Sequence, residues 1–109
     1  VIVTETGAEA LAGRRGRIDE LFTEDHQAEV LRRQIEITAG ADYVRGFCPW
    51  VLYDFRSERR QTEPQRGWNR KGLIAADKTT RKTAFDVVAT AYRARAAAEA
   101  EQLSRSDAP

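Results

Sequence analysis

The chain has 109 residues, of which 41% are hydrophobic and 32% are charged, and its formal net charge is +1. These values are ordinary for one small globular domain, and a charge so close to zero argues against nucleic-acid binding carried by bulk charge alone. No apolar run approaches the roughly 18 residues of a membrane span, and a single cysteine, Cys48, excludes an internal disulfide and a cysteine zinc cluster.

The chain opens in a short apolar run and contains no methionine. Because a translated protein begins with methionine, we expect this chain to be a piece of a longer polypeptide. Residues 1 to 4 are β-branched throughout, which predicts a short buried strand. The glycines and arginines of residues 7 to 19 predict a loop after it.

A helix is predicted over residues 23 to 39. Thr23 is a good N-cap, and the acidic residues that follow it suit the positive end of the helix dipole. Gly40 is a plausible stop. Residues with the spacing of one helix face are Ala28, Leu31, Ile35 and Thr38.

The most hydrophobic stretch, residues 43 to 53, is rich in aromatic and β-branched side chains and predicts a strand buried on both sides. Pro49 cannot donate to a sheet ladder, so the strand should end or distort near Pro49 and Trp50. A long basic loop is expected over residues 54 to 72, and a short extended piece over 73 to 76.

A second helix is predicted from an N-cap at Thr80, fading near residue 100, with residues 104 to 109 as a frayed tail. Its inner face should hold Ala84, Phe85, Val88, Ala91 and Tyr92. Strands alternating with helices indicate an α/β fold with a parallel sheet. Two strands cannot bury both faces of such a sheet, so the chain requires strands that it does not contain.

Two residues at the predicted strand ends are candidates for chemistry. Glu5 lies where the first strand runs into a glycine-containing loop, and a carboxylate there suits a nucleophile or an acid/base; the alternative is a solvated loop glutamate. Trp50 lies at the equivalent end of the second strand. Its ring suits a platform for a sugar, and the alternative is core packing.

The basic loop over residues 54 to 72 allows three interpretations. It suits a pocket for an anionic group, a surface for a phosphate backbone with Trp68 as a stacking residue, or a solvated loop neutralised by acids elsewhere. His26, the only histidine, fits a surface position. No spacing of ligating residues predicts a metal site, and no glycine-rich phosphate loop is present.

Three segments resemble glycoside hydrolase family 2, the β-glucuronidase and β-galactosidase family. Residues 3 to 13, Val-Thr-Glu-Thr-Gly-Ala-Glu-Ala-Leu-Ala-Gly, resemble the seventh-strand motif that carries the nucleophile. Residues 22 to 29, Phe-Thr-Glu-Asp-His-Gln-Ala-Glu, resemble the start of the following helix. Pro49-Trp50 through Ile74 resembles the eighth strand and the loop after it. The order and spacing of the three segments make the resemblance specific.

This resemblance implies that the chain supplies the last two βα units of a (β/α)8 TIM barrel, incomplete as a stand-alone domain. Residues 1 to 95 would run from strand 7 to helix 8, and residues 96 to 109 would be the helix end and a disordered tail. A retaining mechanism is implied, with Glu5 as nucleophile and a second glutamate, outside this chain, about 5–5.5 Å away. Trp50 would line the sugar subsite, and the peptide after it is often cis in such barrels.

Asn69 and Lys71 match the Asn-X-Lys motif with which β-glucuronidases bind the sugar carboxylate. The resemblance therefore implies a carbohydrate substrate, first of all a β-glucuronide, with the rest of the catalytic domain as partner and with no cofactor, metal, nucleic acid or membrane. It leaves open a homo-oligomer of the full-length enzyme. Thr6, where β-glucuronidases usually carry tyrosine, and the unusual eighth strand keep a β-galactosidase as the alternative. A basic nucleic-acid-binding module is the alternative of another class. The chain alone should be inactive.

Overall fold

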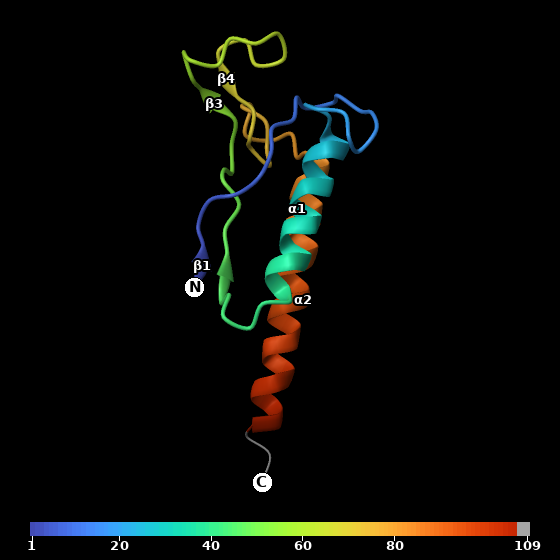
Figure 1. Ribbon diagram of the computed structural model, residues 1–109, viewed down its shortest axis with the longest axis vertical. Coiled ribbons are helices and arrows are strands. Elements are labelled where there is room, and N and C mark those ends of the chain that lie inside the picture. Colours follow the sequence, from blue (N-terminus) through green and yellow to red (C-terminus); the bar gives the residue numbers. More distant parts are fainter. Residues whose placement is uncertain (107–109) are drawn as a thin grey trace.

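The computed structural model describes residues 1–106 as two strand–helix units with a hairpin inserted before the second helix. The two helices pack against each other and run in the same direction (Figure 1). The elements, in chain order, are β1 (Ile2–Val3), α1 (Glu24–Ala39), β2 (Gly46–Phe47), β3 (Phe55–Arg56), β4 (Trp68–Asn69) and α2 (Thr83–Ser106). The predicted α/β organisation is confirmed at this level.

The strands β1 and β2 pair in parallel, with Ile2 opposite Gly46 and Val3 opposite Phe47. This confirms the parallel arrangement expected from the alternation of strands and helices. The second strand is much shorter than the predicted 43 to 53, and Tyr43 and Leu52 are exposed rather than buried. The prediction of burial on both sides is wrong for this chain because, within residues 1–106, β2 has a single neighbouring strand.

Helix α1 forms as predicted. The Thr23 hydroxyl accepts a hydrogen bond from the His26 N–H at 3.0 Å, which satisfies one of the free donors at the helix start. The helix ends at Ala39, with Gly40 as its C-cap in an ordinary right-handed conformation. Both ends of α1 are therefore defined, and its buried face points toward α2.

A hairpin replaces part of the loop that was expected over residues 54 to 72. Strands β3 and β4 pair antiparallel, with Phe55 opposite Asn69. The connection between them, residues 57 to 67, ends in a turn in which the Trp68 N–H donates to the Gln65 carbonyl at 3.0 Å and Arg66 and Gly67 have positive φ. The guanidinium of Arg56 lies 5.2 Å from the Trp68 ring centroid, across the strand pair.

Helix α2 begins at Thr83, two residues later than an N-cap at Thr80 predicts. The Thr80 hydroxyl and N–H both bond to the Asp77 carboxylate, so that Thr80 belongs to the preceding turn. The helix does not fade near residue 100 but continues to Ser106. Residues 107 to 109 of the expected tail lie outside the described residues.

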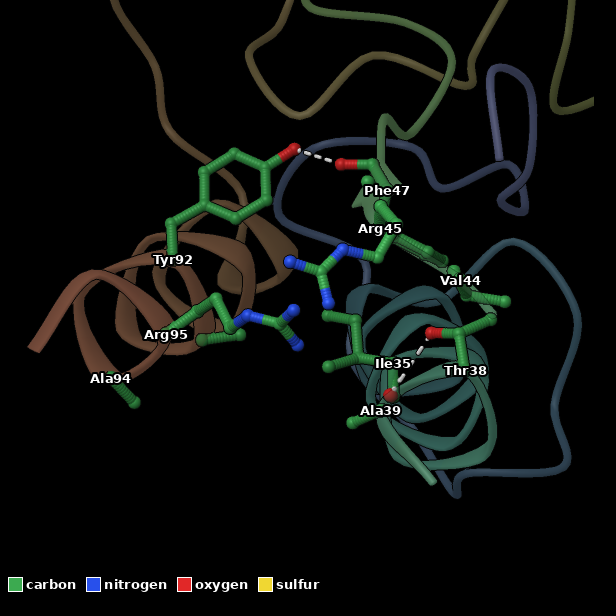
Figure 2. A pocket seen from close by; sticks show the side chains of 11 residues that line it. Ile35, Thr38, Ala39, Val44, Arg45, Phe47, Tyr92, Ala94 and Arg95 are labelled. Atoms are coloured by element: carbon green, nitrogen blue, oxygen red, sulfur yellow. Dashed lines mark hydrogen bonds between the residues drawn. The ribbon is translucent and has the colours of Figure 1, made fainter. Parts of the chain in front are cut away.

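The core lies between the two helices and the segment that follows the hairpin. It consists of Ala28, Leu31, Leu73, Ala84 and Val88, with Ile35, Phe47, Phe85 and Val87 packed against it. Tyr92, expected on the inner face, is half exposed, and its hydroxyl donates to the Phe47 carbonyl at 2.6 Å (Figure 2). No helix of residues 1–106 is long and apolar enough to cross a membrane.

Candidate active site

Glu5 and Trp50 follow the carboxyl ends of the paired strands β1 and β2, as predicted. The two segments stay together beyond the strands, because the Trp50 N–H donates to the Thr6 carbonyl at 2.8 Å. Gly7 has a φ of 143°, and a Cβ there would lie 3.3 Å from the Trp50 carbonyl oxygen. A glycine at this position therefore allows the loop after Glu5 to lie directly against Trp50.

The Glu5 side chain is exposed. Within residues 1–106 its carboxylate takes part in no hydrogen bond or ion pair. This differs from Glu9 and Glu24 nearby, whose carboxylates are engaged by N–H groups. The Glu5 carboxylate is thus exposed and engaged by no other described residue.

Trp50 lies between an aromatic residue and a cation. Its ring meets Phe55 edge to face, with centroids 5.3 Å apart, and the Lys71 ammonium lies 5.9 Å from its centroid. The peptide between Trp50 and Val51 is cis, as the family resemblance implied. One face of the Trp50 ring is therefore turned toward Lys71.

Asn69 and Lys71 lie on the strand and turn that return from the hairpin. Asn69 is 1% exposed, and its Oδ1 accepts a hydrogen bond from the Lys71 N–H at 2.9 Å. The Lys71 carbonyl in turn accepts from the Val51 N–H at 3.3 Å, which ties this turn to the segment after Trp50. The amide of Asn69 is therefore held in one orientation against the backbone of Lys71.

The structure thus brings together Trp50, Asn69 and Lys71 and attaches the Glu5 loop to Trp50. An ammonium and an amide side by side can bind a carboxylate through charge-assisted hydrogen bonds. The ring beside them offers an apolar face. Among residues 1–106 no group of three ligating side chains is placed to hold a metal ion.

Glu9 belongs to this site, although the sequence did not single it out. Its carboxylate accepts hydrogen bonds from the Arg70 N–H at 3.0 Å, from Gln65 Nε2 at 2.8 Å and from Arg60 at 3.1 Å. The signal available in the sequence was only an acid four residues after Glu5. Its partners lie more than fifty positions away, beyond the reach of local patterns.

Lys82 and Asp54 form a second feature that sequence reasoning missed. The Lys82 ammonium donates to Asp54 Oδ1 at 2.8 Å, to the Ala10 carbonyl at 2.7 Å and to the Arg70 carbonyl at 3.0 Å. Burial raises the pKa of Asp54 and lowers the pKa of Lys82, and each charge opposes the shift of the other. The pair fastens the turn before Lys71 to the loop after Glu5.

Three of the five arginines in residues 54 to 72 lie beside acids. Arg60 contacts Glu9 at 3.1 Å, and Arg66 contacts Glu63 at 3.3 Å. Arg70 is 3.9 Å from Asp54 and also lies over the Trp68 ring. This pairing fits the interpretation of a neutralised loop better than that of a phosphate-binding surface.

A cavity of about 400 Å³ lies elsewhere, between β2 and the two helices (Figure 2). It is lined mainly by apolar residues of α1 and α2, with the side chains of Arg45 and Arg95 reaching into it from opposite sides. None of Glu5, Trp50, Asn69 and Lys71 lines this cavity. The predicted site residues therefore lie outside this cavity.

Comparison with known proteins places the chain beside uronic acid glycosidases, although no family model matches it. A β-glucuronidase of Paenibacillus borealis is 32% identical over 84 residues, which cover 77% of this chain and 14% of that protein. The structure of a GH2 β-galacturonidase from Eisenbergiella tayi bound to galacturonate is 26% identical, with a TM-score of 0.75 over 85% of this chain and 17% of that one. A Lactobacillus rhamnosus β-glucuronidase is also 26% identical, with a TM-score of 0.70, over 84% of this chain and 15% of that one.

Proposed function

We propose that this chain, which is related in sequence and structure to the glycoside hydrolases of family 2, forms the last two βα units of a (β/α)8 catalytic barrel. Three features support the proposal: β1 and β2 pair in parallel, each is followed by a helix, and the two helices run in the same direction (Figure 1). In such barrels the reacting side chains project from the carboxyl ends of the strands. The chain spans 14–17% of the length of the relatives first compared, so the rest of the barrel would come from other parts of the polypeptide.

The activity we assign to that barrel is retaining exo-hydrolysis of terminal β-linked sugars. The observation that carries the assignment is the meeting of the Glu5 loop, Trp50 and Lys71 at one end of the strand pair. Glu5 would attack the anomeric carbon and form a glycosyl-enzyme intermediate. A second carboxylic acid, from outside this chain and about 5–5.5 Å away, would protonate the leaving oxygen and then activate water.

A uronic acid is the sugar that the site fits best. Asn69 and Lys71 together supply neutral and charged donors suited to a C6 carboxylate, whereas a neutral sugar offers no charge in return. The relatives whose names include β-glucuronidase and β-galacturonidase, one of them bound to galacturonate, support this class of substrate. A β-galactosidase of the same family is the second candidate, favoured by Thr6, where a tyrosine is usual in β-glucuronidases.

The proposal assigns each part of the chain to a part of the barrel. Residues 1 to 95 would contribute strand 7 to helix 8, and the remaining turns of α2 would extend beyond the barrel wall. The chain by itself would be inactive, because the proton donor and six of the eight βα units of such a barrel lie outside it.

The test compares the full-length enzyme with its Glu5→Gln variant on aryl β-glucuronide and aryl β-galactoside. Hydrolysis of the glucuronide by the wild type, with activity lost in Glu5→Gln, is expected. Glu36→Gln, which alters an exposed glutamate on α1, serves as the matched control and should leave activity unchanged. Cleavage of the galactoside alone would overturn the sugar assignment, and an active Glu5→Gln variant would overturn the nucleophile assignment.

A further inference from the structure

Glu9 connects the loop that carries Glu5 to the hairpin that carries Asn69 and Lys71. Its side chain is 13% exposed, and its two carboxylate oxygens receive N–H groups from three residues of the hairpin and the turn after it. Oε1 accepts from Arg60 at 3.1 Å and from Gln65 at 2.8 Å; Oε2 accepts from Gln65 at 3.1 Å and from the Arg70 N–H at 3.0 Å. All of these partners are hydrogen-bond donors. A carboxylate can accept from all of them, whereas the NH2 group of an amide side chain can accept from none.

The contact with Arg70 has the most direct bearing on the site. Arg70 lies between Asn69 and Lys71, and both of its backbone polar groups are fixed from the same loop. Its N–H donates to the Glu9 carboxylate, and its carbonyl accepts from the Ala10 N–H at 2.9 Å. The peptide units that orient Asn69 and Lys71 are thus held by the residues four and five positions after Glu5.

We propose that Glu9 is a positioning residue that holds the Asn69–Lys71 turn at the distance from Glu5 that a bound uronic acid requires. The inference rests on the proposed function and adds a role for a residue that touches no substrate itself. The nucleophile and the carboxylate-binding donors belong to segments sixty-four positions apart, from Glu5 to Asn69, so their separation must be set by contacts between the segments. Glu9 provides one charge-assisted part of that contact, and the Lys82 ammonium, bonded to the Ala10 and Arg70 carbonyls, provides another.

The test is Glu9→Gln in the full-length enzyme. The amide nitrogen must face one of the donors that the carboxylate now accepts, so the turn should shift while the fold is kept. We expect KM for aryl β-glucuronide, and the inhibition constant of free D-glucuronate, to rise about tenfold or more. The turnover per active site, titrated with a fluoroglycoside inactivator, should change little.

Glu63→Gln is the matched control. Glu63 is a glutamate of the same hairpin, but it is 72% exposed and pairs with Arg66 and, at 4.0 Å, with Arg14. Its removal should leave both KM and the glucuronate inhibition constant at the wild-type values. The control separates loss of the Glu9 contacts from loss of one negative charge at or beside the hairpin.

Three sets of outcomes would overturn the inference. Unchanged KM and inhibition constant per titrated site, with only a lowered melting temperature, would show that Glu9 stabilises the fold and would overturn the positioning role. A wild-type enzyme that cleaves no uronide, or an active Glu5→Gln variant, would overturn the proposed function and this inference with it. If Glu9→Gln fails to fold, Arg60→Met removes its charged partner alone, and an unchanged KM in that variant would also overturn the inference.

Discussion

The ammonium of Lys82 lies 2.8 Å from Asp54 Oδ1, and neither side chain is exposed by more than 1%. Lysine is among the residues least often fully buried, and here it is satisfied by one carboxylate and two backbone carbonyls. The three acceptors come from the loop after Glu5, the segment after Trp50 and the turn before Lys71. One side chain therefore joins the three segments that form the candidate site.

Lys82→Met should destabilise the folded enzyme strongly. The substitution leaves Asp54 buried without the cation bonded to it and the Ala10 carbonyl without its side-chain donor. The expected loss is about 3–5 kcal/mol in the free energy of unfolding. Denaturant unfolding of the full-length enzyme measures it. Lys78→Met, which alters an exposed lysine over the Tyr53 ring, should cost far less. A Lys82→Met enzyme as stable as that control would show that the buried pair contributes nothing.

Lys71→Ala should separate uronic acid substrates from neutral ones. Removing the ammonium deletes the charged partner of the C6 carboxylate. The value of kcat/KM for aryl β-glucuronide should therefore fall roughly 30- to 1000-fold, a loss of about 2–4 kcal/mol in transition-state stabilisation. A neutral aryl glycoside should lose little. The measurement is the ratio of the two specificity constants in the variant and in wild type. Equal losses on both substrates would contradict the carboxylate-binding role.

Trp50→Ala should raise KM by about tenfold, because it removes the apolar ring face on which a sugar would pack. Trp50→Phe retains an aromatic face beside Phe55, so its KM should lie much closer to the wild-type value than that of Trp50→Ala. Tyr43→Ala removes an exposed aromatic residue at the other end of the strand and should leave KM unchanged. Steady-state kinetics on the aryl glycoside, with all three variants equally folded by circular dichroism, makes the comparison. Identical KM values for Trp50→Ala and Tyr43→Ala would exclude Trp50 from the sugar subsite.

Glu24→Gln should destabilise the enzyme in a pH-dependent way. Burial raises the pKa of Glu24, but hydrogen bonds from Gly13 and Thr83 outweigh it and lower the pKa below the ordinary value of 4.5. The carboxylate therefore contributes stability that is fully present above pH 4.5 and is lost as the pH falls through the lower folded pKa.

The expected difference in unfolding free energy between wild type and Glu24→Gln is about 1–3 kcal/mol at pH 6. Melting temperatures recorded from pH 6 downward should show this gap constant to about pH 4.5 and narrowing below it. Asp19→Asn, at an exposed surface ion pair, is the control. A gap that widens on acidification would reverse the sign and refute the assignment.

Local signals in the sequence were sufficient for α1 and for the parallel strand pair. Thr23 lies directly before two acids and a periodic apolar face, and each of these signals acts within a few residues. The same reasoning misplaced the start of α2, because Thr80 resembles a cap but its hydroxyl bonds to Asp77. A threonine with a nearby acid has two local partners, and a sequence pattern does not rank them.

The long-range part of the site was not predictable in this way. The family resemblance pointed to Glu5, Trp50, Asn69 and Lys71, and their juxtaposition follows the strand ends. Glu9 and Lys82 act through partners far along the chain, and in the sequence they resemble ordinary surface charges. Their role depends on burial, which for a charged residue is decided by the whole fold.

The contacts of Lys82 also bear on the order in which the molecule folds. Its ammonium bonds to residues 72 and 28 positions earlier, so these bonds close long loops and require the chain from Ala10 to the start of α2 to be in place. Contacts of such long range form late, after helices and hairpins that need only neighbours. Recovery of inhibitor binding should therefore lag behind recovery of the helix signal during refolding. A folding intermediate in which α2 has not yet docked would contain the sheet and α1 but no sugar-binding site.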